Sequence, residues 1–192
     1  MKRKAVFLDR DGTINVEKNY LYRIADFEFL PEVKSSLKKF QEMGYLLIVV
    51  TNQSGIGRGY YSEADFYVLN EWMVSSLARE GINISKVYYC PHLPDAPIEL
   101  YRKQCSCRKP AIGMYERAML EFDIDMEMSI AVGDKIRDCA ICDRYNCRGF
   151  LIGDNEKKPI IDEVKDGKYI NVEYAVDLRA VVDKIISSRV EE

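Results

Sequence analysis

The sequence predicts an α/β fold, a Rossmann-like parallel sheet with helices on both faces. Short apolar runs alternate with stretches of helical spacing, and several of these runs end in polar residues. The length of 192 residues, with 47% hydrophobic and 31% charged residues, suits one domain with a buried core. We therefore expect a single domain over residues 1–192, with no separate cap domain.

Five apolar runs are predicted strands, at residues 4–8, 45–50, 86–89, 128–132 and 149–152, and a short late strand is expected at 168–172. A helix is predicted to begin at Pro31, whose fixed φ suits a first turn, and another at Ser62, a favoured N-cap residue. Further helices are expected over 114–122, from about residue 136 and over 176–186. The segment 91–109, rich in Pro and Cys, is predicted to be a loop.

Charge and hydropathy exclude several classes of partner. The 28 basic and 31 acidic residues give a net charge of −3, whereas duplex-binding proteins usually carry a basic surface. No apolar run approaches the roughly 20 residues of a membrane span, and the apolar run after Met1 is too short for an export signal. We therefore expect a cytoplasmic protein that binds neither nucleic acid nor membrane, and a monomer is the default expectation.

Two carboxylates follow the first predicted strand. Asp9 and Asp11 stand two positions apart, so in an extended segment both point to one side. Such a pair can hold Mg²⁺, which prefers oxygen ligands, or divide its work between a nucleophile and an acid–base group. A polar turn at a strand end is the ordinary alternative, because Asp-Gly is a common turn pair.

Three further polar segments follow later strands. Thr51 to Gly55 offers a hydroxyl and backbone N–H groups that suit phosphate oxygens. Arg108 and Lys109 would neutralise charge on a transferred phosphoryl group. Asp134 could complete a magnesium shell, with Asp138 one helical turn beyond it. Each segment alone has an ordinary explanation, respectively a polar turn, an exposed basic pair and a helix cap.

Together these segments resemble the haloacid dehalogenase superfamily of phosphohydrolases, and within it the D-glycero-D-manno-heptose 1,7-bisphosphate 7-phosphatases and the related histidinol-phosphatases. The resemblance runs from about Val6 to Asp138. It rests on five motifs: Leu8-Asp9-Arg10-Asp11-Gly12-Thr13-Ile14-Asn15, Val50-Thr51-Asn52-Gln53-Ser54-Gly55-Ile56, Tyr89-Cys90-Pro91-His92, Cys105-Ser106-Cys107-Arg108-Lys109-Pro110 and Val132-Gly133-Asp134-Lys135. Residues 153–160 are acidic and then basic, and here the chain departs from the usual tail of the family.

The resemblance implies roles for individual residues. Asp9 is expected to be the nucleophile and Asp11 the general acid and base, while Thr51 and Lys109 stabilise the transferred group. The implied magnesium ligands are Asp9, Asp11 through its carbonyl, and Asp134. The expected substrate-binding residues are Arg108, Lys135, Asn52, Gln53, Ser54, Glu17, Lys18, Asn19 and Tyr20.

Cysteine spacing indicates a second metal. One imidazole and three thiolates, from Cys90, His92, Cys105 and Cys107, make a Cys₃His set for structural Zn²⁺. Cys-x-Cys is tighter than the usual finger spacing, and the family resemblance strengthens the assignment because a zinc loop at about residues 90–109 is typical there. The remaining cysteines, Cys139, Cys142 and Cys147, are interpreted as small apolar core residues rather than a redox pair or further metal site.

The expected activity is Mg²⁺-dependent hydrolysis of a small phosphorylated sugar through an aspartyl-phosphate. The resemblance implies removal of the 7-phosphate of heptose 1,7-bisphosphate, in nucleotide-heptose and lipopolysaccharide biosynthesis. Histidinol phosphate or another small sugar phosphate is the alternative substrate. A non-catalytic, zinc-stabilised binding module is a less favoured interpretation, because Asp9, Asp11, Lys109 and Asp134 are all present.

Overall fold

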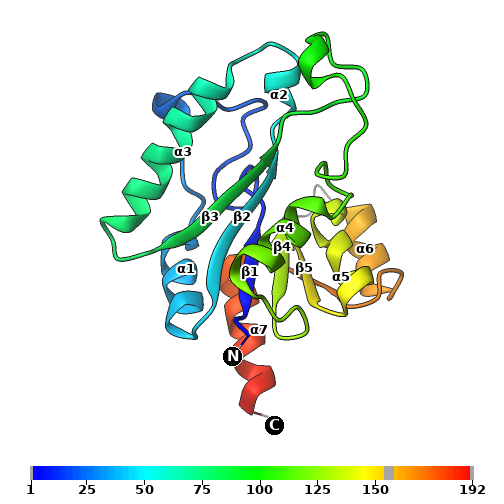
Figure 1. The fold of residues 1–192 in the computed structure, drawn as a ribbon. Helices are drawn as coiled ribbons and strands as arrows, with labels where there is room; N and C mark the ends of the chain where they lie inside the picture. Colours follow the sequence, from blue (N-terminus) through cyan, green and yellow to red (C-terminus); the bar gives the residue numbers. More distant parts are fainter. Residues whose placement is uncertain (1, 154–157, 191–192) are drawn as a thin grey trace.

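The computed structural model describes residues 2–153 and 158–190. Its sheet contains six parallel strands in the order β3-β2-β1-β4-β5-β6 (Figure 1). The strands are β1 Ala5–Leu8, β2 Leu46–Asn52, β3 Ile84–Cys90, β4 Ile130–Gly133, β5 Arg148–Ile152 and β6 Val172–Ala175. The predicted fold class is thereby confirmed.

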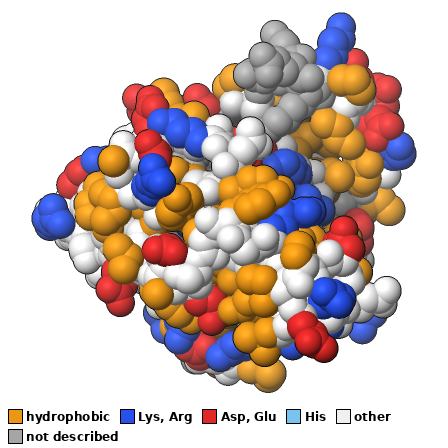
Figure 2. All heavy atoms as spheres, turned by 90° about the horizontal axis from the view of Figure 1, so that it is seen from above, with side chains coloured by type: hydrophobic (Ala, Val, Ile, Leu, Met, Phe, Trp, Pro, Cys, Tyr) orange, Lys and Arg blue, Asp and Glu red, His pale blue; other side chains and the backbone are white. Residues whose placement is uncertain are grey.

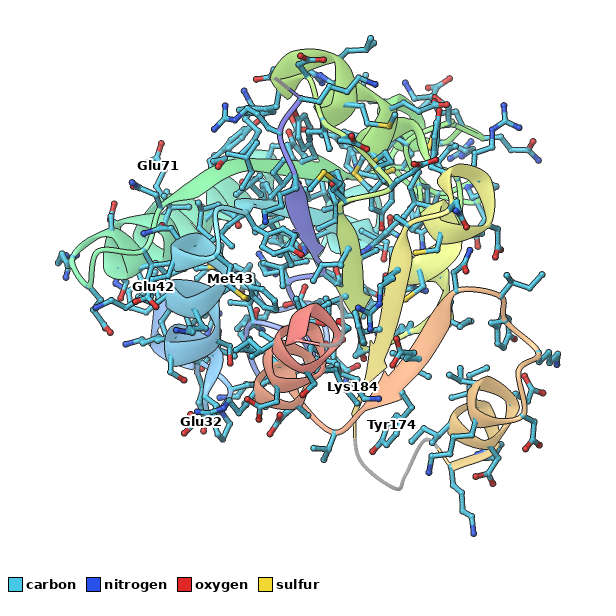
Figure 3. All side chains as sticks on the ribbon, turned by 90° about the horizontal axis from the view of Figure 1, so that it is seen from below. Glu32, Glu42, Met43, Glu71, Tyr174 and Lys184 are labelled. Carbon is cyan, nitrogen blue, oxygen red and sulfur yellow. The ribbon has the colours of Figure 1, made fainter. Side chains whose placement is uncertain are left out.

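Helices cover both faces of the sheet. One core packs α1 Val33–Glu42, α3 Glu63–Ala78 and α7 Leu178–Val190 against the sheet. The other core packs α4 Gly113–Phe122, α5 Ala140–Tyr145 and α6 Lys158–Lys165 against the opposite face. Figure 3 shows α1 and α7 side by side, with Lys184 of α7 on the side of β6. The short elements are η1 Ile24–Asp26, α2 Ser54–Gly57, η2 Glu99–Tyr101 and η3 Ile136–Cys139.

The central strand β1 is a continuous apolar run because its residues face both cores. Val6 and Leu8 belong to the first core, whereas Ala5 and Phe7 belong to the second. Successive side chains of a strand point to opposite faces, so a strand covered by helices on both sides has no polar position. The run ends where the chain leaves the sheet, at Asp9.

The strand order places the site. The chain crosses from the β1–β2–β3 half to the β4–β5–β6 half, so the order reverses between β1 and β4. In open parallel sheets, ligands bind at this switch point beyond the carboxyl ends of the strands. Asp9 follows β1, and its backbone N–H donates to the Val132 carbonyl of β4 at 3.0 Å. Asp134 follows β4, so the two carboxylates meet at the crevice.

Two expectations for the C-terminal third need revision. The late strand predicted at 168–172 is wrong in position, because β6 begins at Val172 and the preceding residues form a turn in which Asn171 has φ of 62°. Helix α6 was not predicted, since its eight residues bury only Ile161 and Val164. Of the segment 153–160, where the sequence departs from its family, residues 154–157 lie outside the described residues.

Among the helices that the structure describes, none combines the length and the apolar character that crossing a bilayer requires.

Candidate active site

A cavity of about 320 Å³ opens at the switch point, which is within the range usual for small-molecule sites. Looking down on the molecule from above, Figure 2 shows a group of Lys and Arg side chains bordered by hydrophobic ones. The cavity is lined by Asp9, Asp11, Glu17, Asn19, Tyr20, Asn52, Gln53, Ser54, Arg58, Tyr61, Arg108, Lys135 and Arg137. Acidic and basic groups thus face the same space.

Lys109 joins two carboxylates behind this cavity. Its Nζ lies 3.0 Å from Asp9 Oδ1 and 2.7 Å from Asp138 Oδ1, and it donates to the Val50 carbonyl at 2.6 Å. The Lys109 side chain is 1% exposed, so these contacts are shielded from water. Asn52 fixes the Lys109 main chain through hydrogen bonds of 3.1 Å to both its N–H and its carbonyl. Lys109 is therefore held rigidly with its ammonium beside Asp9.

Burial and the oppositely charged neighbours shift the pKa values of Lys109 and Asp138 in opposite directions. Burial alone lowers the pKa of Lys109, but the charges of Asp9 and Asp138 outweigh it and raise the pKa above its usual value. Burial raises the pKa of Asp138 to about 6, although Lys109 acts in the opposite direction. Lys109 thus stays cationic, as stabilisation of a phosphoryl group requires.

Asp11 is held by donors on both oxygens. The Arg10 guanidinium forks onto the carboxylate at 3.0–3.2 Å, and Asn15 Nδ2 donates to Oδ1 at 3.0 Å. Gln53 Nε2 donates to Asp11 Oδ2 and to Thr51 Oγ1, each at 2.9 Å. Asp11 and Asp9 line the same cavity, as their spacing predicts, and Asp11 has the fixed orientation that an acid–base group needs.

The magnesium ligands were predicted as Asp9, Asp11 and Asp134. Asp9 and Asp134 come together with Asp138, and one carboxylate oxygen from each lies within 4.8 Å of the others. Gly12, at φ of 81°, permits this approach, because a Cβ there would stand 2.7 Å from the Asp134 carboxylate. This oxygen-only donor set suits Mg²⁺. The Asp11 carboxylate lies outside this set, and the role of the Asp11 carbonyl stays a prediction.

The zinc residues are also brought together. The three Sγ atoms of Cys90, Cys105 and Cys107 lie 3.2–3.6 Å apart, and His92 Nδ1 lies 3.6 Å from Cys90 Sγ and 3.3 Å from Cys107 Sγ. Tetrahedral zinc with bonds of about 2.3 Å to sulfur requires sulfur atoms roughly 3.8 Å apart. The observed cluster is slightly contracted from that geometry, and its donor set fits zinc.

The thiols of this loop differ in acidity. Burial raises the pKa of Cys90 and of Cys107. Burial acts in the same direction on Cys105, but hydrogen bonds from Cys107 and from the Arg108 backbone outweigh it and lower the pKa of that thiol. Because Arg108 and Lys109 directly follow Cys107, the loop geometry determines where both cations stand.

The remaining three cysteines lie in the core, where the sequence placed them. Cys139 ends η3, Cys142 lies in α5 and Cys147 directly precedes β5; all three are buried, and Cys142 Sγ lies 3.1 Å from Cys147 Sγ. Among the described residues, this trio is not one of the groups whose ligand atoms converge for a metal ion.

Most predicted substrate residues line the cavity, but Lys18 does not. Its ammonium pairs with Glu28 at 3.2 Å on the surface. Lys135 pairs with Glu17 at 3.4 Å, so the segment after β1 is tied to the segment after β4.

Sequence reasoning left several site residues without a role. Arg10, Asn15, Tyr61, Arg58, Arg137 and Asp138 all belong to the cavity or its supporting contacts. The sequence signals for two of them were Asp138 in Gly-Asp-x-x-x-Asp and Arg58 between two glycines. Arg58, Arg108 and Arg137 line the same cavity, and burial lowers the pKa of Arg108, with the charges of Arg137 and Arg58 acting in the same direction.

Comparisons with known proteins identify the family. The family model described as polynucleotide kinase 3 phosphatase matches residues 4–162. A D-glycero-β-D-manno-heptose-1,7-bisphosphate 7-phosphatase of Haemophilus ducreyi is 50% identical and covers 72% of this chain and 76% of that protein. The chain belongs to this phosphatase family. It is a phosphoric monoester hydrolase, as the sequence predicted.

Further relatives extend the likeness over most of the chain. A protein of the same name from Salmonella typhi is 42% identical, over 94% of this chain and 95% of its own. A D-glycero-α-D-manno-heptose-1,7-bisphosphate 7-phosphatase of Campylobacter jejuni is 44% identical, over 82% and 87%. The family therefore includes relatives named for either anomer.

Solved structures of phosphatases share this fold. D,D-heptose 1,7-bisphosphate phosphatase from B. bronchiseptica, complexed with magnesium and phosphate, has a TM-score of 0.80 at 28% identity, covering 96% of this chain and 99% of that one. A HAD-like phosphatase from Mesorhizobium loti has a TM-score of 0.74 at 33% identity, covering 80% and 74%. The magnesium complex supports Mg²⁺ as the cofactor of this fold.

Proposed function

We propose that the chain removes the 7-phosphate from D-glycero-D-manno-heptose 1,7-bisphosphate, a step of nucleotide-heptose biosynthesis. The observation that carries the proposal is the contact of buried Lys109 with Asp9, directly behind a cavity that Asp9, Asp11 and several cations line. Relatives named for this substrate support the choice of sugar. Because those relatives are named for both anomers, the anomer is left to experiment.

The chemistry follows from two carboxylates. A carboxylate oxygen of Asp9 attacks phosphorus in line, the bond between phosphorus and the ester oxygen breaks, and Asp11 gives that oxygen a proton. Water then attacks the aspartyl-phosphate, gives a proton to Asp11, and releases phosphate and free Asp9. Lys109 and Thr51 stabilise the phosphoryl oxygens during both transfers.

Two metals fit this scheme. Asp9, Asp134 and the Asp11 carbonyl would hold Mg²⁺, which would supply positive charge against the phosphate oxygens. Cys90, His92, Cys105 and Cys107 would hold Zn²⁺ as a structural ion with all four positions filled. The zinc loop would then fix Arg108 and Lys109, which follow its last ligand.

The cations of the cavity suit a substrate with two phosphates. Arg58, Arg108, Lys135 and Arg137 line the cavity, and Nε of both Arg58 and Arg137 is buried without a hydrogen-bond partner among the described residues. Guanidinium groups bind phosphate by paired hydrogen bonds, so these side chains would bind the phosphate that is not cleaved. The polar groups of Glu17, Asn19, Tyr20 and Ser54 would bind the sugar. The side-chain amides of Asn52 and Gln53 also line the cavity but already pair with Lys109 and with Asp11. Lys18, which is paired with Glu28, is not expected to bind it directly.

We further propose that the chain acts as one domain and as a monomer. A cytoplasmic location is proposed because the six cysteines form no disulfide and three of them are proposed zinc ligands, and such thiols persist best in a reducing compartment.

The test is phosphate release with Mg²⁺ from a substrate panel. The panel contains both anomers of heptose 1,7-bisphosphate, histidinol phosphate, fructose 1,6-bisphosphate and a 3′-phosphorylated oligonucleotide. The proposal predicts that one heptose anomer has by far the highest kcat/KM. Preference for histidinol phosphate or the oligonucleotide would overturn the substrate, and no turnover of any compound by metal-loaded protein would overturn the catalytic assignment.

A further inference from the structure

The hydroxyl of Tyr61 is aimed into the catalytic network although its ring lies in a separate apolar cluster. The residue follows α2 and is 7% exposed, packed with Ile56 and Phe66. Its ring stacks on Tyr22, with centroids 5.2 Å apart. The hydroxyl donates to Gln53 Oε1 at 2.5 Å, a short hydrogen bond in a site shielded from water. A ring needed only for packing would not require this hydroxyl.

Gln53 transmits that contact to the acid–base group. Its Oε1 accepts from Tyr61 and, at 3.3 Å, from Arg10 Nη2. Its Nε2 donates to Asp11 Oδ2 and to Thr51 Oγ1. An amide has one oxygen and one nitrogen end, so two donors at Oε1 force the NH₂ group toward Asp11. Gln53 is 2% exposed, and a flip would leave buried groups with mismatched partners.

We propose that Tyr61 is a positioning residue for the phosphatase reaction: its hydroxyl fixes the Gln53 amide, which orients the carboxyl of Asp11 toward the leaving oxygen. The inference rests on the proposed function only in the role given to Asp11. Tyr61 itself touches neither the phosphoryl group nor the proton that Asp11 transfers.

Two features of the fold maintain this arrangement. Gly55 lies against the Tyr61 ring, and a Cβ at that position would stand 2.2 Å from Tyr61 Cε1, so only glycine admits the ring here. Burial, aided by the charges of Asp11 and Glu17 against that of Arg10, raises the pKa of Tyr61 above its usual value. The hydroxyl therefore keeps its proton at neutral pH and remains a donor.

Substrates with different leaving groups can distinguish a positioning role of Tyr61 from a role in packing alone. A sugar alkoxide needs a proton from Asp11 as it leaves, whereas p-nitrophenolate leaves readily without one. For both substrates, kcat/KM reports the steps up to formation of the aspartyl-phosphate. Loss of Asp11 orientation should therefore lower kcat/KM for the sugar phosphate much more than for p-nitrophenyl phosphate.

The experiment compares Tyr61→Phe with wild type on the preferred sugar phosphate and on p-nitrophenyl phosphate. We expect kcat/KM to fall about tenfold for the sugar phosphate, mainly through kcat, and less than about twofold for p-nitrophenyl phosphate. Tyr22→Phe is the matched control, because its hydroxyl contacts Arg23 at the surface. It should leave both substrates at wild-type rates.

A second background tests whether the effect passes through Gln53. Gln53→Met removes the amide at similar volume and should itself reproduce the selective loss on the sugar phosphate. Adding Tyr61→Phe to Gln53→Met should then change kcat/KM by less than about twofold, because coupled residues are not additive.

The proposal is overturned by equal losses on the two substrates, by full additivity of the two substitutions, or by wild-type activity of Tyr61→Phe. Absence of turnover in the wild-type protein would instead refute the proposed function.

Discussion

Replacing Lys109 with Met should destabilise the protein and abolish phosphatase activity. The loss of stability should depend on pH, because Lys109 lies between the carboxyl groups of Asp9 and Asp138. The substitution keeps the length of the side chain and removes a buried ammonium held by Asp9, Asp138 and the Val50 carbonyl. Two carboxylates are then left together without their counter-charge. Removal of one partner from a buried ion pair costs about 3–5 kcal/mol.

Proton uptake supplies the part of this cost that depends on pH. A buried carboxyl can escape its charge by binding a proton, and in wild type the pKa of Asp138 is already raised from 3.8 to about 6. Holding this carboxyl neutral at pH 7 in the variant therefore costs about 1.4 kcal/mol more than in wild type, at roughly 1.4 kcal/mol per pH unit above 6. A total deficit of about 3–5 kcal/mol corresponds to a fall in Tm of the order of 10 °C.

The sign of the pH dependence follows by linkage. In the variant the pKa of Asp138 rises further, so the folded state binds more protons than the unfolded chain and its stability falls as pH rises. In wild type, the fall in stability with rising pH occurs only between the ordinary pKa of 3.8 and the folded-state pKa of about 6, because Asp138 is ionised above that range. The stability deficit of the variant should therefore grow between pH 6 and pH 8.

The assay is thermal and denaturant unfolding at pH 6, 7 and 8 without added Mg²⁺, together with phosphate release. Lys103→Met is the control, since Lys103 is exposed on the same loop. A deficit below about 1 kcal/mol, or one that shrinks as pH rises, would refute the electrostatic reasoning.

Three further predictions concern the zinc loop, the cavity and the surface. Cys107→Ser should lower bound zinc well below one ion per chain and reduce kcat, as measured by metal analysis and phosphate release. The control Cys147→Ala should keep one zinc ion per chain. One zinc ion per chain in Cys107→Ser would contradict the proposed zinc site. Arg137→Met should lower kcat/KM about tenfold for a sugar bisphosphate but only slightly for a sugar monophosphate. The control Arg144→Met, at an exposed position, should keep the wild-type kcat/KM for both substrates. An equal fall of kcat/KM for both substrates in Arg137→Met would exclude a role of Arg137 in binding the second phosphate. Glu173 lies between Arg148 and Lys184, and although burial raises its pKa, these partners lower it below the usual 4.5. The resulting stability, about 0.5 kcal/mol for a partly exposed group, is present above pH 4.5 and lost as pH falls below it; Glu173→Gln should be less stable than wild type at pH 7 but not at pH 3, and a constant Tm difference would argue against the pairing.

The central strands and the catalytic motifs were predictable because each carries a local signal. The strand ending at Asp9 is buried on both faces and therefore reads as an unbroken apolar run. The fold rule that ligands bind beyond the carboxyl ends of parallel strands then brought Asp9 and Asp134 together without any tertiary information. The convergence of Cys90, His92, Cys105 and Cys107 was predictable for a similar reason, since two short Cys-containing motifs hold all four side chains.

Other features depend on contacts that no local pattern encodes. Arg10 reads as a surface cation between two acids, yet it is fully buried, with its Nη2 paired to Asp11, Gln53 and the Leu21 carbonyl. Tyr61 reads as a loop aromatic, and its contact with Gln53 exists only because Gly55 leaves room for its ring.

The ends of the sheet were less predictable than its centre. Edge strand β6 has four residues with two partly exposed, so its pattern is weak, and the apolar Ile170 just before it is 73% exposed. Lys18 belongs to a segment whose neighbours line the cavity, but its own side chain turns to Glu28.

The most direct test of the central claim is phosphate release from heptose 1,7-bisphosphate, with Mg²⁺, by wild type and by Asp9→Asn. The substitution removes the nucleophilic carboxylate while retaining size and an acceptor oxygen for Lys109. The account predicts rapid release of one phosphate per substrate by wild type and a loss of at least about 10³-fold in Asp9→Asn. Turnover of the variant at a rate near that of wild type would contradict the account.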